Sequence, residues 1–281
     1  MSTSLLTTSV TVWCAPPTPC PPDTAHWLSA DEAAKASRFR QPVDHDRFVT
    51  GRLLTRAALG ERLGVAPGDV DIRLGARDGT APGRPFARTG PSFSIAHAGS
   101  WVLVAVVDAA GPSLPGPAAA TVPDAGSDVG AGVHVGVDVE STAPARTHLA
   151  DLLDAVPAGE SPADGWDAES FTRSWVRREA VLKAVGTGLL APRDDLLLSP
   201  ADRSAAVACS GGLLPAPDRL VVQDLDLSAA PSAGRPSPPA DRHDTYLAAV
   251  SLCSPRRPVA LGAVTLADGT ALLARHGRTA P

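Results

Sequence analysis

The sequence predicts an α+β fold, in which helices and strands are mixed without the regular alternation of βαβ units. Short apolar runs of strand length recur along the 281-residue chain, and several of them alternate apolar with other residues. Two longer segments, residues 43–63 and 167–185, instead space their apolar residues as amphipathic helices do. A stretch of small residues at 109–132 separates two parts of the chain that share a similar order of elements, without any sequence repeat.

The part before residue 109 is expected to form strands around one long helix. Ser29 is a candidate helix N-cap, and Glu32 three residues later would complete a capping box. Residues 101–107 are apolar throughout, which is typical of a strand covered on both faces. The expected elements are a strand at 9–14, a helix from Ser29, the helix at 43–63, a strand at 70–74, a loop at 79–92, and two strands within 93–108 around a turn at 97–100.

The part after residue 132 is expected to begin with a strand, because valine alternates with other residues in "GVHVGVDVE" at 132–140. The helix at 167–185 is followed by Gly186, a residue type that commonly ends helices. The remaining expectations are strands at 194–198, 205–209, 218–224 and 245–252, a Pro/Ser/Ala-rich linker at 228–242, and a hairpin within 260–277 that turns at Asp268 and Gly269.

These elements divide the chain into four parts. They are an N-terminal half (1–108), a Pro/Ala/Gly-rich insertion (109–132), a C-terminal half (133–255) and a C-terminal extension with the hairpin (256–281). The insertion holds mainly small residues and proline, so it cannot supply a hydrophobic core.

Composition narrows the class of protein. Hydrophobic residues make up 44% of the chain and charged residues 20%, as is ordinary for a soluble globular protein. The net charge of -5 argues against a general nucleic-acid partner. No basic leader precedes an apolar segment, and the longest apolar run, 101–107, is too short to span a membrane, so we expect a cytoplasmic protein with no membrane partner. The four cysteines have no paired spacing that would indicate a zinc site.

Two pairs of charged residues are candidates for chemistry. Asp138 and Glu140 lie two residues apart on one strand face, about 7 Å apart at the backbone. Glu179 and Lys183 lie four residues apart on the predicted helix. The alternatives are a polar strand face in water and an ordinary ion pair on a solvated helix. If Glu179 joined the other carboxylates, the three could bind Mg²⁺, which prefers oxygen ligands and commonly accompanies substrate phosphates.

Five stretches together resemble one known family. They are "KASRF" (35–39), "GRPF" (83–86), "FSIAHAGSWVLVAV" (93–106), "GVDVE" (136–140) and "WVRREAVLKAVGTGL" (175–189). In this order they are similar to the motifs of the Sfp-type 4′-phosphopantetheinyl transferases, of the holo-acyl-carrier-protein synthase superfamily. The resemblance implies two similar α/β halves related by a pseudo-twofold axis, with the active site in the cleft between them.

The resemblance also implies an activity. Such enzymes transfer the phosphopantetheine arm of coenzyme A to a serine hydroxyl of an apo acyl or peptidyl carrier protein, and they release adenosine 3′,5′-bisphosphate. Asp138, Glu140 and Glu179 would bind Mg²⁺. Either Glu179 or a metal-bound water would take the serine proton, and Lys183 would stabilise or protonate the leaving bisphosphate. We expect a monomer.

The nucleotide end of coenzyme A requires cations. By motif position, the residues that would bind coenzyme A are His97, Arg84, Lys35 and Arg47. Four other arginines are expected on solvated helix faces or at carrier-protein contacts: Arg38, Arg40, Arg52 and Arg56. The chain departs from the family at Ser94, where the family has asparagine, and at Ala96, where it has serine.

Two other functions agree with the same residues. One is a different Mg²⁺-dependent phosphoryl-transfer enzyme, which would need neither His97 nor a coenzyme A site. The other is a non-catalytic relative that binds coenzyme A or a carrier protein. Such a relative would be free to lose the acidic residues and Lys183.

Overall fold

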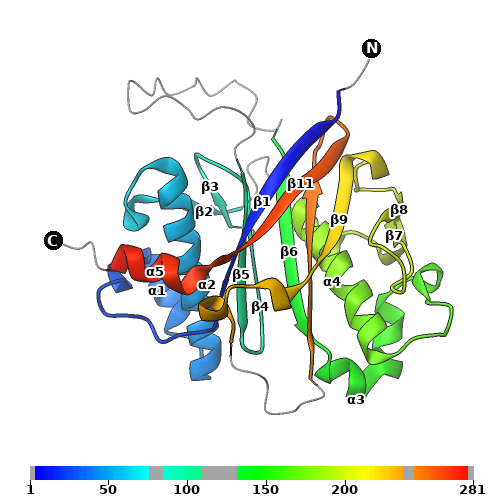
Figure 1. Cartoon of the computed structure of the whole chain (residues 1–281), viewed down its shortest axis with the longest axis horizontal. Coiled ribbons are helices and arrows are strands. Elements are labelled where there is room, and N and C mark those ends of the chain that lie inside the picture. The colour runs from blue at the N-terminus through cyan, green and yellow to red at the C-terminus, as the bar shows by residue number, and fades with distance from the viewer. Residues whose placement is uncertain (1–3, 76–84, 109–131, 237–243, 278–281) are drawn as a thin grey trace.

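The computed structural model describes residues 4–75, 85–108, 132–236 and 244–277. Within these ranges, strands and helices follow one another without regular alternation, which confirms the predicted α+β class. Two sheets lie next to each other in the centre, and helices cover them on both outer sides (Figure 1).

The first sheet has four strands in the order β11-β1-β5-β4. Their bounds are Leu6–Ala15 (β1), Phe93–Ala98 (β4), Trp101–Val107 (β5) and Val259–Asp268 (β11). β5 runs antiparallel to both β1 and β4, whereas β11 runs parallel to β1. One face is covered by helices α1 (Ala30–Ala36), α2 (Pro42–Leu63) and α5 (Gly269–Gly277) (Figure 1).

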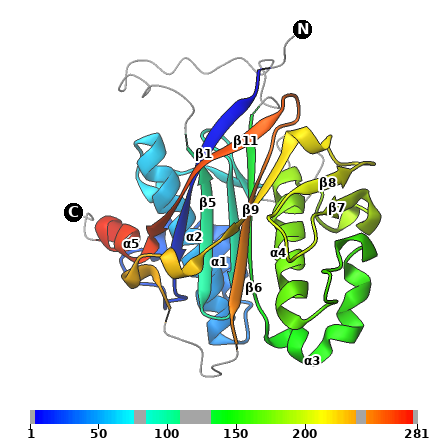
Figure 2. The same ribbon diagram turned by 45° about the vertical axis from the view of Figure 1, so that its right-hand side comes forward.

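The second sheet has three antiparallel strands in the order β6-β10-β9. They are β6 (His134–Ser141), β9 (Leu220–Leu225) and β10 (Tyr246–Cys253). Helix α4 (Ala168–Val185) covers the outer face of this sheet, and α3 (Ala143–Leu152) packs on α4 (Figure 2). Two small two-stranded sheets complete the fold: β2 (Ile72–Leu74) with β3 (Pro85–Ala87), and β7 (Leu196–Leu198) with β8 (Val207–Ser210).

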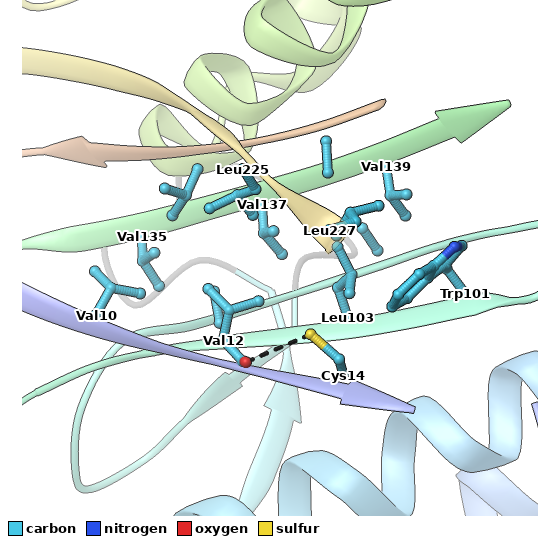
Figure 3. Close-up of a cluster of buried hydrophobic side chains, with 14 of the residues drawn as sticks. Val10, Val12, Cys14, Trp101, Leu103, Val135, Val137, Val139, Leu225 and Leu227 are labelled. Atoms are coloured by element: carbon cyan, nitrogen blue, oxygen red, sulfur yellow. Dashed lines mark hydrogen bonds between the residues drawn. The ribbon is translucent and has the colours of Figure 1, made fainter. Parts of the chain in front are cut away.

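The inner faces of the two sheets share one hydrophobic core. Val135, Val137 and Val139 of β6 point toward side chains of β1 and β5, and each is at most 1% exposed (Figure 3). Each buried valine stabilises the fold by about 1.5–3 kcal/mol relative to an exposed one. The predicted alternation of this strand is therefore confirmed.

Ser92, which directly precedes β4, and Ser94 of β4 join the first sheet to β6. The Val135 N–H donates to the Ser92 hydroxyl and the Val137 N–H donates to the Ser94 hydroxyl, both over 3.1 Å. Because β6 is an edge strand of the second sheet, the two serines supply hydrogen-bond acceptors to backbone donors along its free edge. The two sheets are thus held edge to edge by polar contacts as well as by the core.

Most of the predicted elements are present. Ser29 and Glu32 form a complete capping box at α1, and Asp167 caps α4 through the Ser170 N–H. Gly186 ends α4 with a φ of 87°, a backbone conformation that glycine adopts without steric cost. Helix α2 and strands β1, β2, β4 to β10 lie where the sequence pattern placed them, within a few residues.

The predicted C-terminal hairpin is wrong. β11 ends at Asp268, and α5 begins at Gly269 instead of a return strand. The Asp268 carboxylate accepts a hydrogen bond from the Ala271 N–H, which satisfies a donor of the first helical turn. Leu272 is fully buried in the core beneath α2, so tertiary packing stabilises a helix where the Asp-Gly pair suggested a turn.

Some elements were not predicted, and some predictions fall on residues that the structure describes only in part. The sequence pattern missed α3 and the short strand β3, which lies within the predicted loop. Of the predicted linker, residues 228–236 are described, and Ala230 is buried in the core between the sheets. The insertion lies outside the described residues except for Gly132. The pseudo-twofold relation of the two halves and the four-part division stay predictions. In the described ranges, no helix has the length and apolarity needed to cross a membrane.

Gly136 allows β6 to lie directly against α4. A Cβ at this position would lie 2.0 Å from the Ala180 carbonyl oxygen and 2.5 Å from the Ala184 nitrogen, both backbone atoms of α4. Real Cβ contacts are never this short, so any side chain at residue 136 would force the strand and the helix apart.

We therefore expect Gly136→Ala to lower the free energy of unfolding by about 1–3 kcal/mol through overpacking. The matched control is Gly132→Ala, because a Cβ at Gly132 meets no atom within 4 Å and should change stability by less than about 0.5 kcal/mol. Urea denaturation of both variants measures the difference. Equal stability of the two variants would contradict this account of the β6–α4 contact.

Candidate active site

A cavity of about 820 Å³ lies where α2, β4, β6 and α4 meet. It is lined by Lys35 of α1, Phe48 and Arg52 of α2, Pro85, residues 93–97 of β4, Asp138 and Glu140 of β6, Trp175, Glu179, Leu182 and Lys183 of α4, and Gly186, Thr187, Gly188 and Leu190. The lining thus brings together residues that are more than a hundred positions apart in the chain.

One wall of the cavity, which we call the carboxylate wall, consists of Asp138, Glu140, Glu179 and Lys183. Lys183 donates a hydrogen bond of 2.7 Å from Nζ to the Asp138 Oδ1. The other carboxylate oxygen, Asp138 Oδ2, is buried and has no hydrogen-bond partner in the described structure. Asp138 follows Gly136 on the same strand face, so the close approach of β6 to α4 brings this carboxylate within reach of Lys183.

The three carboxylates repel one another. Burial, and after it the negative charge of Asp138, together raise the pKa of Glu140 to about 7. Burial also raises the pKa of Glu179, again with Asp138 as the second cause. For Asp138, burial raises the pKa while the charge and the hydrogen bond of Lys183 lower it. A single ammonium group therefore compensates only part of the negative charge on this wall.

The predicted magnesium set is not assembled as a tight cluster. The described residues contain no group of three or more His, Cys, Asp or Glu side chains arranged to hold a metal ion. Lys183 binds one oxygen of Asp138 in this arrangement. The residues nevertheless fit a divalent cation, because the orphaned Asp138 Oδ2 and the crowded glutamates are oxygen donors that lack compensating charge. The assignment of Mg²⁺ to this wall stays a prediction.

A second wall, which we call the cationic wall, consists of Lys35, Arg52 and His97. Lys35 Nζ lies 5.2 Å from the centroid of the Phe48 ring, and the Arg52 guanidinium lies 5.1 Å from the same centroid. Both distances are within the range of cation–π attraction. Lys35 and His97 thus both line the cavity, and their roles in coenzyme A binding stay predictions.

The expectation that Arg52 and Arg56 lie on solvated helix faces is wrong. Arg52 is 8% exposed and Arg56 is 3% exposed. Arg56 donates to the Glu32 carboxylate over 2.8 Å and to the Val70 carbonyl oxygen over 2.9 Å, so it ties α2 to α1 and to the chain before β2. Arg38 and Arg40, by contrast, are exposed as expected.

Arg47 contacts the turn that follows His97. Its Nε donates to the Gly99 carbonyl oxygen over 2.7 Å, and its Nη1 donates to Asp44 over 2.8 Å. A Cβ on Gly99 would lie 1.8 Å from the Tyr246 hydroxyl oxygen, so Tyr246 of β10 packs closely on the other side of this turn. Arg47 is not among the described residues that line the cavity. Its role in coenzyme A binding stays a prediction, and its contacts position the turn beside His97.

His97 is the exposed next-to-last residue of β4. Loss of hydration beside the cavity lowers the pKa of its imidazole, and the charges of Lys183 and Arg47 lower it further. An anion bound nearby would act in the opposite direction, because it would stabilise the protonated ring. Arg84, the other predicted ligand of coenzyme A, lies outside the described residues.

The sequence pattern missed a buried ion pair behind α4. Glu160 is fully buried and accepts hydrogen bonds from Arg178, Ser174 and the Leu198 N–H. Arg178 also donates to the Leu196 carbonyl oxygen over 2.8 Å. These hydrogen bonds hold α4 against β7 through Arg178, the residue that directly precedes Glu179. Glu160 ends a 3-10 helix of three residues, Ala158–Glu160, which is too short to show a hydrophobic pattern, so no local signal could have identified it.

The cavity has chemistry suited to a phosphorylated ligand. Cations can pair with phosphate groups directly, whereas carboxylates can pair with them through a divalent cation. Both kinds of wall are present in one cavity of an α+β fold. The fold and the cavity therefore define the class as an α+β protein with a cavity lined by both acidic and basic side chains.

Comparison with known proteins names the family that this chain resembles. Residues 134–223 match the 4′-phosphopantetheinyl transferase superfamily. The chain is 30% identical over 178 residues to the 4′-phosphopantetheinyl transferase HetI of Nostoc sp. strain PCC 7120, which covers 59% of this chain and 63% of that protein. It is 26% identical over 189 residues to the putative 4′-phosphopantetheinyl transferase slr0495 of Synechocystis sp. strain PCC 6803, over 63% of this chain and 65% of the relative.

A third relative is the 4′-phosphopantetheinyl transferase psf-1 of Bacillus pumilus, 25% identical over 169 residues, or 58% of this chain and 60% of that protein. The matched part spans less than two thirds of the length of these relatives. The resemblance to 4′-phosphopantetheinyl transferases is confirmed. The family match includes both β6 and α4, the elements that carry the carboxylate wall.

We expect Mg²⁺ binding to weaken as the pH falls through about 7. Glu140 takes up a proton in this range, and a protonated carboxyl group is a poor cation ligand. Between about pH 8 and about pH 6, the apparent affinity should fall roughly tenfold, in proportion to the ionised fraction of Glu140. Calorimetric titration of the protein with MgCl₂ at both pH values measures this change.

The matched control is Glu140→Gln, whose side chain cannot titrate. Its affinity for Mg²⁺ should be lower and nearly independent of pH over this range.

The stability of the metal-free protein should show the opposite trend to metal binding. Because the folded-state pKa of Glu140 is raised above its usual value, its contribution to stability decreases as the pH rises toward about 7. A pH-independent affinity of the wild-type protein would contradict the assignment of Glu140.

Proposed function

We propose that this protein transfers the 4′-phosphopantetheine arm of coenzyme A to a serine hydroxyl of an apo acyl or peptidyl carrier protein, in a Mg²⁺-dependent reaction that releases adenosine 3′,5′-bisphosphate. One observation carries the proposal. Asp138, Glu140, Glu179 and Lys183 share one wall of a cavity whose other wall is cationic, and their two elements lie in the segment that matches the transferase superfamily.

The carboxylate wall would hold the metal ion through Asp138, Glu140 and Glu179. When bound there, Mg²⁺ supplies positive charge that neutralises the pyrophosphate of coenzyme A and the leaving phosphate. The support in the chain itself is the unpartnered Asp138 Oδ2, together with the burial and the Asp138 charge that raise the pKa values of both glutamates.

The residues of the chain have three tasks in the transfer. The serine oxygen of the carrier forms a bond to the phosphorus next to pantetheine, while the bond from that phosphorus to the bridging oxygen breaks. The bonding electron pair leaves with adenosine 3′,5′-bisphosphate. Glu179 accepts the serine proton, because its carboxylate lines the cavity in which the serine would be placed. Lys183 donates a hydrogen bond to the leaving oxygen, for which its mobile ammonium group is suited.

The same proposal includes the partners and the setting. The carrier protein would bind beside the cavity with its serine directed toward Glu179. We propose a monomer, because the cavity is formed within a single chain and contains side chains for each step. We also propose that the protein acts in the cytoplasm. The other Mg²⁺-dependent phosphoryl-transfer reactions do not account for the match to phosphopantetheinyl transferases.

The test is an assay with purified protein, MgCl₂, coenzyme A and a panel of apo carrier proteins, read by mass spectrometry of the carriers. We expect the mass of phosphopantetheine on the carrier serine, and no addition when a chelator replaces Mg²⁺. Glu179→Gln should lower kcat at least about a hundredfold, because general-base catalysis contributes this much. Absence of transfer to every carrier would refute the proposed activity.

The matched control for Glu179→Gln is Glu169→Gln on the same helix. Glu169 lies in the first turn of α4, is exposed and pairs with Arg173 away from the cavity. Its replacement should leave kcat within about twofold of the wild-type value. A binding-only relative would bind coenzyme A without transferring its arm, so this outcome would identify the non-catalytic alternative.

A further inference from the structure

Two serine hydroxyls in series hold the free edge of β6 against the first sheet. Ser92 accepts a hydrogen bond from the Val135 N–H over 3.1 Å. Ser94 accepts one from the Val137 N–H over the same distance. The two serines are two residues apart, as are the two donors, so both pairs follow one another in the same direction along the chain. The next position on β4 is Ala96, which has no hydroxyl. Of the two serines, Ser94 therefore holds the donor nearer to the carboxylate wall.

The two serine contacts differ in their surroundings. The hydrogen bond to Ser94 is buried, whereas the one to Ser92 is partly buried. Ser94 is 8% exposed and lines the cavity, and Ser92 is not among the described residues that line it. A buried N–H without an acceptor is costly, so β6 would shift toward another partner if the Ser94 hydroxyl were removed.

Asp138 directly follows the residue whose N–H is bound by Ser94. Its Oδ1 accepts a hydrogen bond of 2.7 Å from Lys183, which belongs to α4 and not to β6. This length is typical of a bond between charged groups, and a displacement of β6 by about half an ångström would stretch it to the limit of a hydrogen bond. On its other edge, β6 is paired with β10, where Asp138 lies opposite Ala249. Ser94 thus supplies the restraint on the edge of β6 that faces β4.

The same hydrogen bond relates the two walls of the cavity. Ser94 lies on β4 three residues before His97, which belongs to the cationic wall. Its partner strand β6 carries Asp138 of the carboxylate wall. The distance between these two strands, and with it the width of the cavity at this point, is therefore set in part by the Ser94 hydroxyl.

We propose that Ser94 is a positioning residue of the active site: by holding the Val137 N–H, it fixes the Asp138 carboxylate relative to Lys183 and to the cation that the carboxylate wall would bind. Ser94 acts through β6 and not by contact with the substrate. In its effect on the transfer reaction, this inference rests on the proposed function. Asparagine, which the resembled family has at this position, also offers an acceptor oxygen, so serine can meet the same requirement.

The first experiment measures the kinetics of Ser94→Ala with the whole chain, MgCl₂, coenzyme A and an apo carrier protein. Loss of the acceptor should lower kcat about tenfold and the calorimetric affinity for MgCl₂ by a similar factor, which is the usual effect of removing a group that orients a metal ligand. KM for coenzyme A should stay within about twofold, because no contact with coenzyme A is removed. Ser94→Thr retains the hydroxyl and should restore both quantities. A raised KM with unchanged kcat would make Ser94 a direct ligand and overturn the proposal.

The matched control is Ser92→Ala, which removes a hydrogen bond of the same kind and length two residues further from Asp138. Both alanine variants should lower the urea midpoint of unfolding, because each leaves one backbone donor of β6 without its acceptor. The kcat of Ser92→Ala should nevertheless stay within about twofold of the wild-type value. An equal loss of kcat in both variants would contradict a special role for Ser94. If Ser94→Ala does not fold, as judged by circular dichroism, Ser94→Cys replaces it, because sulfur is only a weak acceptor.

A double-mutant cycle tests the positioning without metal or substrate. Lys183→Met removes the partner of the Asp138 carboxylate. In this background Ser94→Ala should lower the urea midpoint less than it does in the wild-type protein, because the contact that it disturbs is already lost. Ser92→Ala should have the same effect in both backgrounds. An effect of Ser94→Ala that is independent of the background would also overturn the proposal.

The cycle separates failure of this inference from failure of the proposed function. A protein that transfers no arm to any carrier, yet shows the coupling between Ser94 and Lys183, refutes the function and retains the positioning of Asp138. A protein that transfers the arm, with equal kcat values for Ser92→Ala and Ser94→Ala, refutes the inference alone.

Discussion

The contact between β6 and α4 is the constraint on which the rest of this structure depends. Gly136 has no side chain, so the strand can lie against the backbone of the helix at Ala180 and Ala184. Two residues further along the same face, the Asp138 carboxylate then meets Lys183. The opposite face of the strand carries the valines that join both sheets in one core. One strand thus builds the hydrophobic centre with one face and the carboxylate wall with the other.

Charge is concentrated in the cavity at a cost in stability. The carboxylate wall holds three acidic groups against one ammonium group, and burial opposes the ionised form of each acid. The cationic wall has the reverse excess, with Glu32 shared between two arginines. The helices and strands of the fold do not by themselves require an excess of negative charge on one wall or of positive charge on the other. Both are accounted for if the cavity binds a ligand that carries phosphates together with a divalent cation, because each wall then obtains its missing partner.

Rigid neighbours hold these charged groups in place. The Glu160–Arg178 ion pair fixes α4 from behind, and the Ser92 and Ser94 hydroxyls fix the edge of β6 against β4. Ser94 occupies a position where the resembled family has asparagine, and here its hydroxyl serves the joint between the sheets. Arg47 and Tyr246 hold the turn after His97 from two sides. These contacts reduce the reorganisation that would be needed when a ligand binds.

The sequence by itself determined the α+β class, the two long helices, most strands and the residues of the carboxylate wall, because these follow from local periodicity, caps and motif spacing. Tertiary structure alone decided the burial of Arg52, the pairing of Glu160 with Arg178, and the helix after Asp268. Local patterns carry no information about these, since a surface-like arginine becomes buried only when α1 packs on α2. Likewise, the Asp-Gly pair precedes a helix because Leu272 finds a core beneath α2.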